Sequence, residues 1–147
     1  MSGALAGAPA VRAAAALGLG RAPVVEALCA AVVAPAPPLP PVAATDAVPA
    51  FGRLVAAGPP LHRAAIAVAL VLLDLAPLAL GERGRLRGLP PARRDAVVRR
   101  LEHSACGAAV RPLRALLHLA YYGDLDVLRL LGYDPSAVLA RAREPRP

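Results

Sequence analysis

The sequence predicts an all-α protein, an irregular bundle of six or seven helices with a disordered N-terminal leader and an internal proline-rich linker. Among its 147 residues are 36 Ala, 25 Leu and 17 Arg, all strong helix formers. Its 15 Val and single Ile are too scattered for several alternating strands, which effectively excludes an all-β fold. Seventeen Pro divide the chain into short segments, so the expected helices are irregular in length.

The length suits one domain. We expect residues 1–21 to be a disordered Ala-rich leader, residues 22–143 to form one helical domain that contains the linker 35–42, and residues 144–147 to be a tail. The leader resembles an export signal only superficially, because Arg12 interrupts its apolar stretch and no basic residue precedes it. A cytoplasmic location is therefore the default expectation.

Proline and glycine delimit the helices expected in the first half of the chain. The first covers residues 23–34, since Pro23 suits the first helical turn and the prolines from Pro35 onward end it. The linker that follows is expected to be extended and stiff. Asp46 is expected to cap a helix that continues to about Ala57.

Residues 61–80 form the most apolar segment, which is apolar on all sides apart from His62, Arg63 and Asp74. That pattern is typical of a buried central helix. A membrane span is the alternative, although Asp74 would then lie in the middle of the span and Pro77 follows it.

Three further helices are expected at 90–104, 108–122 and 124–131, and another begins at Asp134. The spacing of Leu125, Leu128 and Leu131 predicts an inward face for the helix 124–131, and Gly132 suits a left-handed residue at its end. Arg94 projects from the middle of the apolar arc of the helix 90–104. It must therefore snorkel or meet a carboxylate, for which Asp74 is the candidate.

The positive charge is concentrated in one stretch. The net charge is +7 and every basic residue is Arg, of which seven lie in residues 81–100 against two acidic residues. Guanidinium groups bind phosphates, but this stretch has no aromatic residue to stack a base, and the chain has no Lys, Asn or Gln. The sequence therefore favours a solvated face over a nucleic-acid partner.

No pattern of catalytic, cofactor-binding or metal-ligating residues is evident. His62, His103 and His118 lack partners at metal-ligand spacing. Cys29 and Cys106 lie 77 positions apart, with no redox motif, and we expect buried free thiols rather than a disulfide. The glycines near residue 20 do not make a dinucleotide fingerprint. We therefore expect no catalytic residue, no cofactor-binding residue and no metal site from these motifs.

Three of the four aromatic residues, Tyr121, Tyr122 and Tyr133, lie within thirteen positions of one another. Tyr combines an apolar body with a polar tip, which suits both a protein interface and an internal helix corner. The residues alone do not decide between these two interpretations.

The segment LAYYGDLDVLRLLGYDP, residues 119–135, resembles the end of the small helical subunit of gluconate and glucose dehydrogenases, the gluconate 2-dehydrogenase subunit 3 family. A related helical segment precedes the flavin domain of long-chain alcohol oxidases. Two other segments are similar to family helices, namely residues 94–104 and residues 27–33 before the proline-rich stretch. The resemblance covers about residues 22–135.

This resemblance implies a noncatalytic accessory subunit. Its partner would be the separately encoded catalytic subunit of an FAD-dependent oxidoreductase of the glucose-methanol-choline type, which it would help to fold or stay soluble, or whose substrate access it would shape. Family members that are exported carry a twin-arginine leader, which residues 1–20 lack.

The family motif supplies candidate interface or fold-defining positions at Tyr121, Tyr122, Asp124, Gly132, Tyr133 and Asp134. The outward stripe of the helix 108–122 adds Arg111, Arg114 and His118 as candidate contacts with the partner. An alternative function is that of a peripheral membrane protein, which would bind anionic lipid through the Arg-rich loop and the apolar helices.

Overall fold

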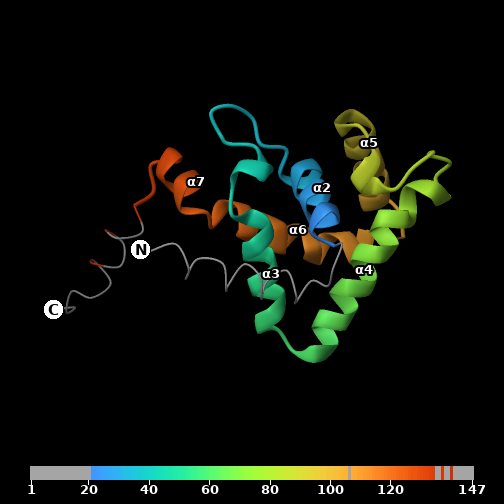
Figure 1. The fold of residues 1–147 in the computed structure, drawn as a ribbon, viewed down its shortest axis with the longest axis horizontal. Coiled ribbons are helices and arrows are strands. Elements are labelled where there is room, and N and C mark those ends of the chain that lie inside the picture. The colour runs from blue at the N-terminus through green and yellow to red at the C-terminus, as the bar shows by residue number, and fades with distance from the viewer. Residues whose placement is uncertain (1–20, 106, 135–136, 138–139, 141–147) are drawn as a thin grey trace, which may run out of the picture.

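The computed structural model describes residues 21–105, 107–134, 137 and 140, and in this part of the chain it is all-α, as predicted (Figure 1). Six α-helices and two short 3-10 helices are present there, and no strand. The α-helices are α2 (Ala22–Val33), α3 (Ala47–Ala57), α4 (Pro60–Ala79), α5 (Pro91–Glu102), α6 (Gly107–Tyr122) and α7 (Leu125–Leu130), and the 3-10 helices are η1 (Val42–Ala44) and η2 (Leu86–Gly88).

The bounds agree with the expected helices to within two residues at nearly every end, because Pro and Gly mark these ends in the sequence. Gly132 adopts the expected left-handed conformation, with φ at 75°, and its N–H donates to the carbonyl of Arg129. The expected leader, the helix expected from Asp134 and the tail lie mostly or entirely outside the described residues.

Helix α2 forms the centre of the fold and contacts α3, α5, α6 and η2. The largest fully buried side chains around it include Phe51 of α3, Leu117 and Tyr121 of α6, and Leu28 of α2 itself. Cys29 is a free thiol in this core, and burial raises its pKa to about 12. A thiol with so high a pKa carries almost no thiolate at neutral pH, so Cys29 has a packing role.

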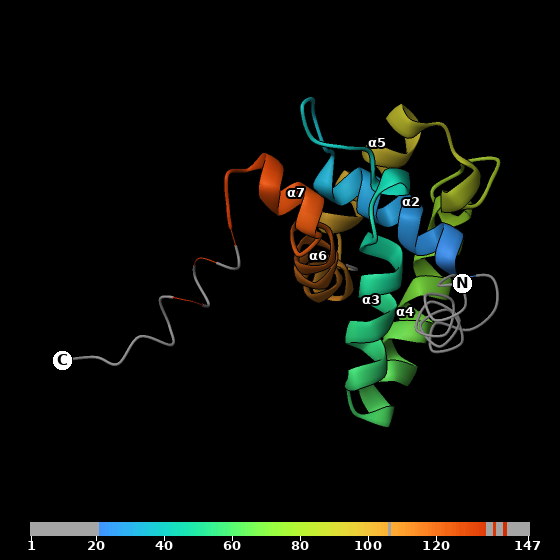
Figure 2. The same ribbon diagram turned by 60° about the vertical axis from the view of Figure 1, so that its left-hand side comes forward.

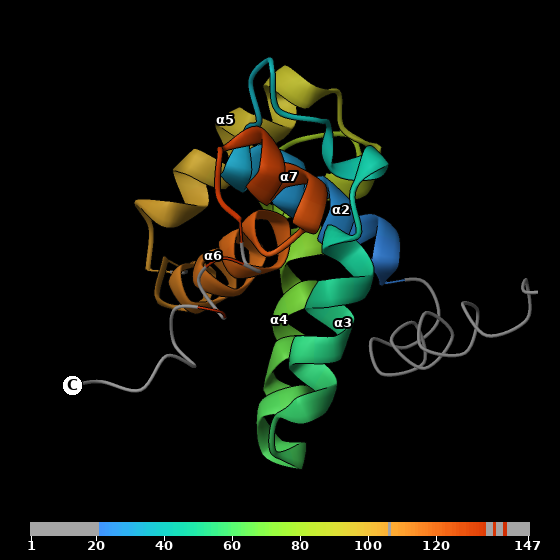
Figure 3. The same cartoon turned by 90° about the vertical axis from the view of Figure 1, so that its left-hand side faces the viewer.

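Helix α4 is at the periphery, which corrects the prediction that residues 61–80 form a buried central helix. Figure 1 shows α3 and α4 meeting at a turn and diverging from it, and Figure 3 shows that this turn extends away from the other helices. Only 22 % of the apolar stretch of α4 is buried. A helix that is apolar on all sides gives no sequence signal for which face is covered, and the shorter α2 takes the central position instead.

Two further expectations change. The residues after α2 are not simply extended, because the N–H of Leu39 donates to the carbonyl of Ala36 at 3.0 Å and closes a turn. The guanidinium of Arg94 donates to the carbonyl of Leu89 at 3.0 Å and does not contact Asp74. Asp74 is buried and instead pairs with Arg87, with Nε and Oδ2 separated by 3.5 Å.

Candidate protein-binding surface

Tyr121 ends up inside the protein. Its side chain is 0 % exposed, and its hydroxyl donates to the carbonyl of Pro40 at 2.6 Å. Burial raises its pKa, and the neighbouring Tyr122, Cys29 and Asp124 raise it further. Tyr121 therefore anchors the proline-rich loop to α6, and of the two roles expected for it, partner contact or fold-defining position, its burial fits the second.

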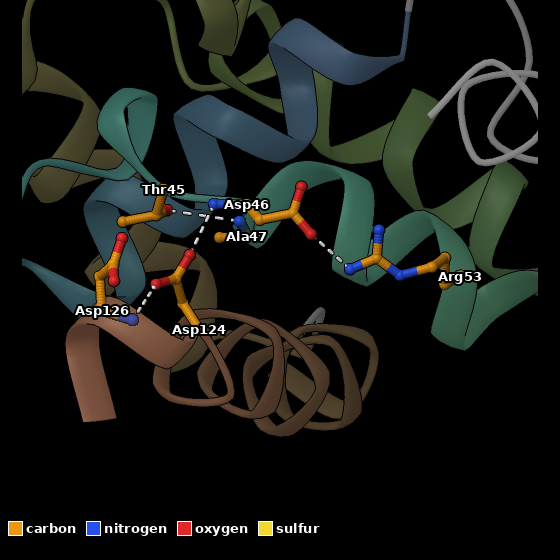
Figure 4. A network of polar contacts seen from close by, with 6 residues as sticks. All are labelled: Thr45, Asp46, Ala47, Arg53, Asp124 and Asp126. Atoms are coloured by element: carbon orange, nitrogen blue, oxygen red, sulfur yellow. Dashed lines mark hydrogen bonds and ion pairs between the residues drawn. The ribbon is translucent and has the colours of Figure 1, made fainter. Parts of the chain in front are cut away.

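Asp124 is a capping residue for two helices at once (Figure 4). Its carboxylate accepts from the backbone N–H groups of Asp126 and Val127, at 2.9 and 3.3 Å, which caps α7. Its other oxygen accepts from the N–H of Asp46, at 2.8 Å, at the start of α3. The residues that carry the family resemblance thus join α3, α6 and α7 at one corner, and Asp124 is engaged within the fold.

Burial raises the pKa of Asp124, but the three N–H donors lower it by more, so that the net pKa lies below its ordinary value. Hydrogen bonds to the charged form of a carboxyl group have this effect. The carboxylate is therefore an anionic cap, and its negative charge also interacts favourably with the positive, N-terminal end of the α7 dipole.

The start of α3 differs from the prediction. Asp46 is the N-cap residue by position, but its side chain makes no cap hydrogen bond and pairs instead with Arg53. The hydroxyl of Thr45 accepts from the N–H of Ala47 at 3.3 Å, and Asp124 accepts from Asp46 itself (Figure 4). One acceptor at the start of α3 is therefore the local Thr45 hydroxyl, and the other comes from a residue 78 positions away, which no local sequence pattern indicates.

The outward stripe of α6 brings the remaining helical candidates together. Arg111 and Arg114 are exposed, and Arg114 pairs with Glu102 at 3.1 Å. His118 lies one turn further on, and its ring stacks on that of Tyr122 with 5.9 Å between the centroids. Tyr122 also packs edge-on against Tyr121. Tyr122 is therefore held in place by its neighbours and is half-buried.

Four leucines that were not among the predicted contact residues are more than half exposed near this corner: Leu119, Leu125, Leu130 and Leu131. Tyr133 is 47 % exposed, and Asp134 is exposed as well. The predicted inward face of α7 is wrong for Leu125 and Leu131, because Val127, at 0 % exposed, fills the core position. Val127 is three positions after the capping residue Asp124, and this spacing is the sequence signal that could have predicted Val127 as the core residue of α7.

We define the corner surface as the exposed side chains Leu119, Leu125, Leu130, Leu131 and Tyr133 at the end of α6 and on and after α7, together with the half-buried His118 and Tyr122. In Figures 1 and 2, α7 lies at one end of the molecule, away from α4 and α5. Exposed leucine and tyrosine on a rigid support are typical of protein interfaces. The family-like residues thus form an internal anchor, the buried Tyr121 and the hydrogen-bonded Asp124, and a more exposed surface beside it.

A shallow pocket of about 430 Å³ lies between α4 and α6, and His62 is its one ionisable lining residue, among Ala65, Ile66, Ala69, Ala109, Pro112, Leu113 and Leu116. A second pocket, of about 460 Å³, is lined by Arg21, Arg85 and Arg87 together with Asp74 and apolar residues of α2 and α4. Among the described residues, no group of three His, Cys, Asp or Glu side chains could hold a metal ion. Neither pocket brings together a nucleophile, a base and an orienting group in the described part of the chain.

Comparison of the chain with protein-family models, with curated proteins and with solved structures gave no match in any of the three.

Proposed function

We propose that this chain is a noncatalytic helical subunit that binds another protein through the corner surface. The observation that carries the proposal is the division of roles in residues 121–133. Tyr121 and Asp124 fix the corner internally, while Leu130 and Tyr133 are exposed and Tyr122 is half-buried beside them. A surface that is apolar, aromatic and held rigidly binds a partner with little loss of conformational entropy.

The resemblance of residues 119–135 supplies the proposed partner, the catalytic subunit of an FAD-dependent oxidoreductase of the glucose-methanol-choline type. In this complex the flavoprotein performs the chemistry, and this chain covers part of its surface and supports its folding or solubility. The exposed leucines of α7 offer the flavoprotein an apolar contact, and Arg111 and Arg114 offer charges at the rim.

The proposal is tested by co-expressing the tagged chain with the flavoprotein of this type that is encoded nearest to it. We expect the two to co-purify, and we expect Leu131→Asp to lower the recovered flavoprotein at least tenfold, because a buried charge then replaces an apolar contact. Ala92→Asp, on the exposed side of α5, is the matched control and should leave recovery unchanged. Absence of association by the unchanged chain, or equal recovery with both variants, would contradict the proposal.

A second candidate function is binding to anionic lipid. It is favoured by α4, which is long and apolar enough to cross a membrane by length and composition, and by the arginine-lined pocket beside it, whose walls include Val71 and Leu75. Flotation of the chain with vesicles that contain acidic phospholipid, absent with neutral vesicles and weakened by salt, is the expected result for this function. Equal flotation with both kinds of vesicle, or none, would exclude it.

A further inference from the structure

The outer face of α4 is an uninterrupted aliphatic stripe over the whole helix. Its residues are all exposed and all Ala, Val or Leu: Leu61, Ala64, Ala65, Val68, Val71, Leu72, Leu75, Leu78 and Ala79. Six of them are large side chains with 37 to 77 % of their surface exposed. We call these nine residues the α4 stripe.

The polar residues of α4 lie off this stripe. Asp74 is buried on the inner side, where it pairs with Arg87. His62 lines the pocket between α4 and α6. At 100° per residue, Arg63 also lies on the inner half of the helix. No charged side chain of α4 therefore lies within the stripe, and of its large side chains Val71 and Leu75 border the pocket lined by Arg21, Arg85 and Arg87.

The stripe follows a heptad repeat. Leu61, Val68 and Leu75 are separated by seven residues each, and so are Ala64, Val71 and Leu78. Alternating steps of three and four residues are the spacing with which one helix packs along another. The pattern therefore indicates another helix as the occupant of this face.

We propose that a second copy of this chain covers the α4 stripe, with the two α4 helices antiparallel. In this arrangement, two residues that face each other across the dimer interface have residue numbers that add to 139. Leu61 then meets Leu78 of the second copy, Ala64 meets Leu75, and Val68 meets Val71. Each alanine faces a leucine, whereas parallel pairing would set alanine against alanine and leave a gap in the seam.

Charge and shape favour the same direction. The Arg-rich loop follows the C-terminal end of α4, with Arg83, Arg85 and Arg87 all exposed. Parallel pairing would bring two such loops together, while antiparallel pairing separates them by the length of the helix, about 30 Å. Figure 3 shows the N-terminal end of α4 extending, with α3 beside it, away from α2, α5 and α7. In the antiparallel dimer, the main body of each copy would therefore lie next to the projecting end of the other copy.

The area is sufficient for a dimer. Two such stripes would together bury on the order of 1,200 Å², the lower end of the range for specific interfaces. The stripe has no Trp, Tyr or Phe, the residues that anchor helices at a lipid surface, and its alanines let two helices approach closely. These features favour a helix over a lipid surface as its occupant.

The oligomeric state of the full chain tests the proposal. Light scattering after gel filtration is expected to give twice the chain mass of 15.0 kDa. Val68→Asp, near the two-fold axis, is expected to raise the dissociation constant at least a hundredfold, whereas the control Ala92→Asp leaves it unchanged. A chain that is still monomeric at about 100 μM, a concentration at which even a weak complex forms, would overturn the proposal. A monomer that floats with acidic vesicles through α4 would overturn it as well.

Cysteine cross-linking tests the direction of the helices with substitutions that preserve the apolar seam. In a Cys106→Ser background, Ala64→Cys and Leu75→Cys chains are mixed and oxidised. The antiparallel dimer gives the mixed disulfide and little of either homodimer, and a predominance of homodimers would show parallel pairing and overturn the proposal. The proposal is independent of the flavoprotein partner, since Val68→Asp leaves the corner surface intact and should still co-purify with that protein.

Discussion

Replacing Asp124 by alanine is expected to lower the free energy of unfolding by about 3 kcal/mol, because three backbone N–H groups lose a charged acceptor and two helices lose a cap. For a domain of this size the midpoint of thermal unfolding should fall by about 10 °C. Urea denaturation followed by circular dichroism measures the loss. Asp126→Ala is the matched control, since the carboxylate of Asp126 is exposed and pairs only with Arg129 among the contacts seen.

The same substitution has a defined pH dependence. The pKa of Asp124 is lower in the folded chain than in the unfolded one, so its contribution is fully present above the unfolded pKa and is lost as the pH falls through the folded pKa. The difference in stability between the unchanged chain and Asp124→Asn should therefore be constant near neutral pH and should shrink in acid. A difference that grows as the pH falls would contradict the role of Asp124 as an anionic cap.

Tyr121→Ala is expected to have the largest effect, a loss of about 4 kcal/mol, because it removes a fully buried aromatic ring from the centre of the core. Tyr121→Phe isolates the hydrogen bond to Pro40 and should cost about 1 kcal/mol. The control is Tyr133→Ala, at a half-exposed position, with little expected change. A loss below about 1 kcal/mol for Tyr121→Ala would show that the ring does not pack as described.

The helices could be predicted because their ends are encoded locally. Pro23, Gly58 and Gly132 lie within a few positions of the helix ends that they mark, so the local sequence indicates where these helices begin or end. The inner face of α7 was harder to predict, because three leucines at helical spacing obscured Val127, which is smaller and fully buried.

Properties that depend on distant residues could not be predicted. The apolar pattern of residues 61–80 is the same whether the helix is central or peripheral, and only the packing of α2 against α3, α5 and α6 decides between the two. The two interpretations of the tyrosines both describe part of the corner, since Tyr121 is internal and Tyr122 is partly accessible. Neighbouring residues in one motif thus take different roles once the corner is formed.

The hydrogen bond between the carboxylate of Asp124 and the N–H of Asp46 has a consequence for synthesis on the ribosome. Translation proceeds at about 5–20 residues per second, so several seconds pass between the emergence of the first turn of α3 and that of its acceptor. During this interval the start of α3 has only the Thr45 hydroxyl as a cap, and the core position of Tyr121 is not yet filled. Until residues 121–124 have emerged from the ribosome, the nascent chain therefore lacks the contacts that Tyr121 and Asp124 make with its N-terminal half.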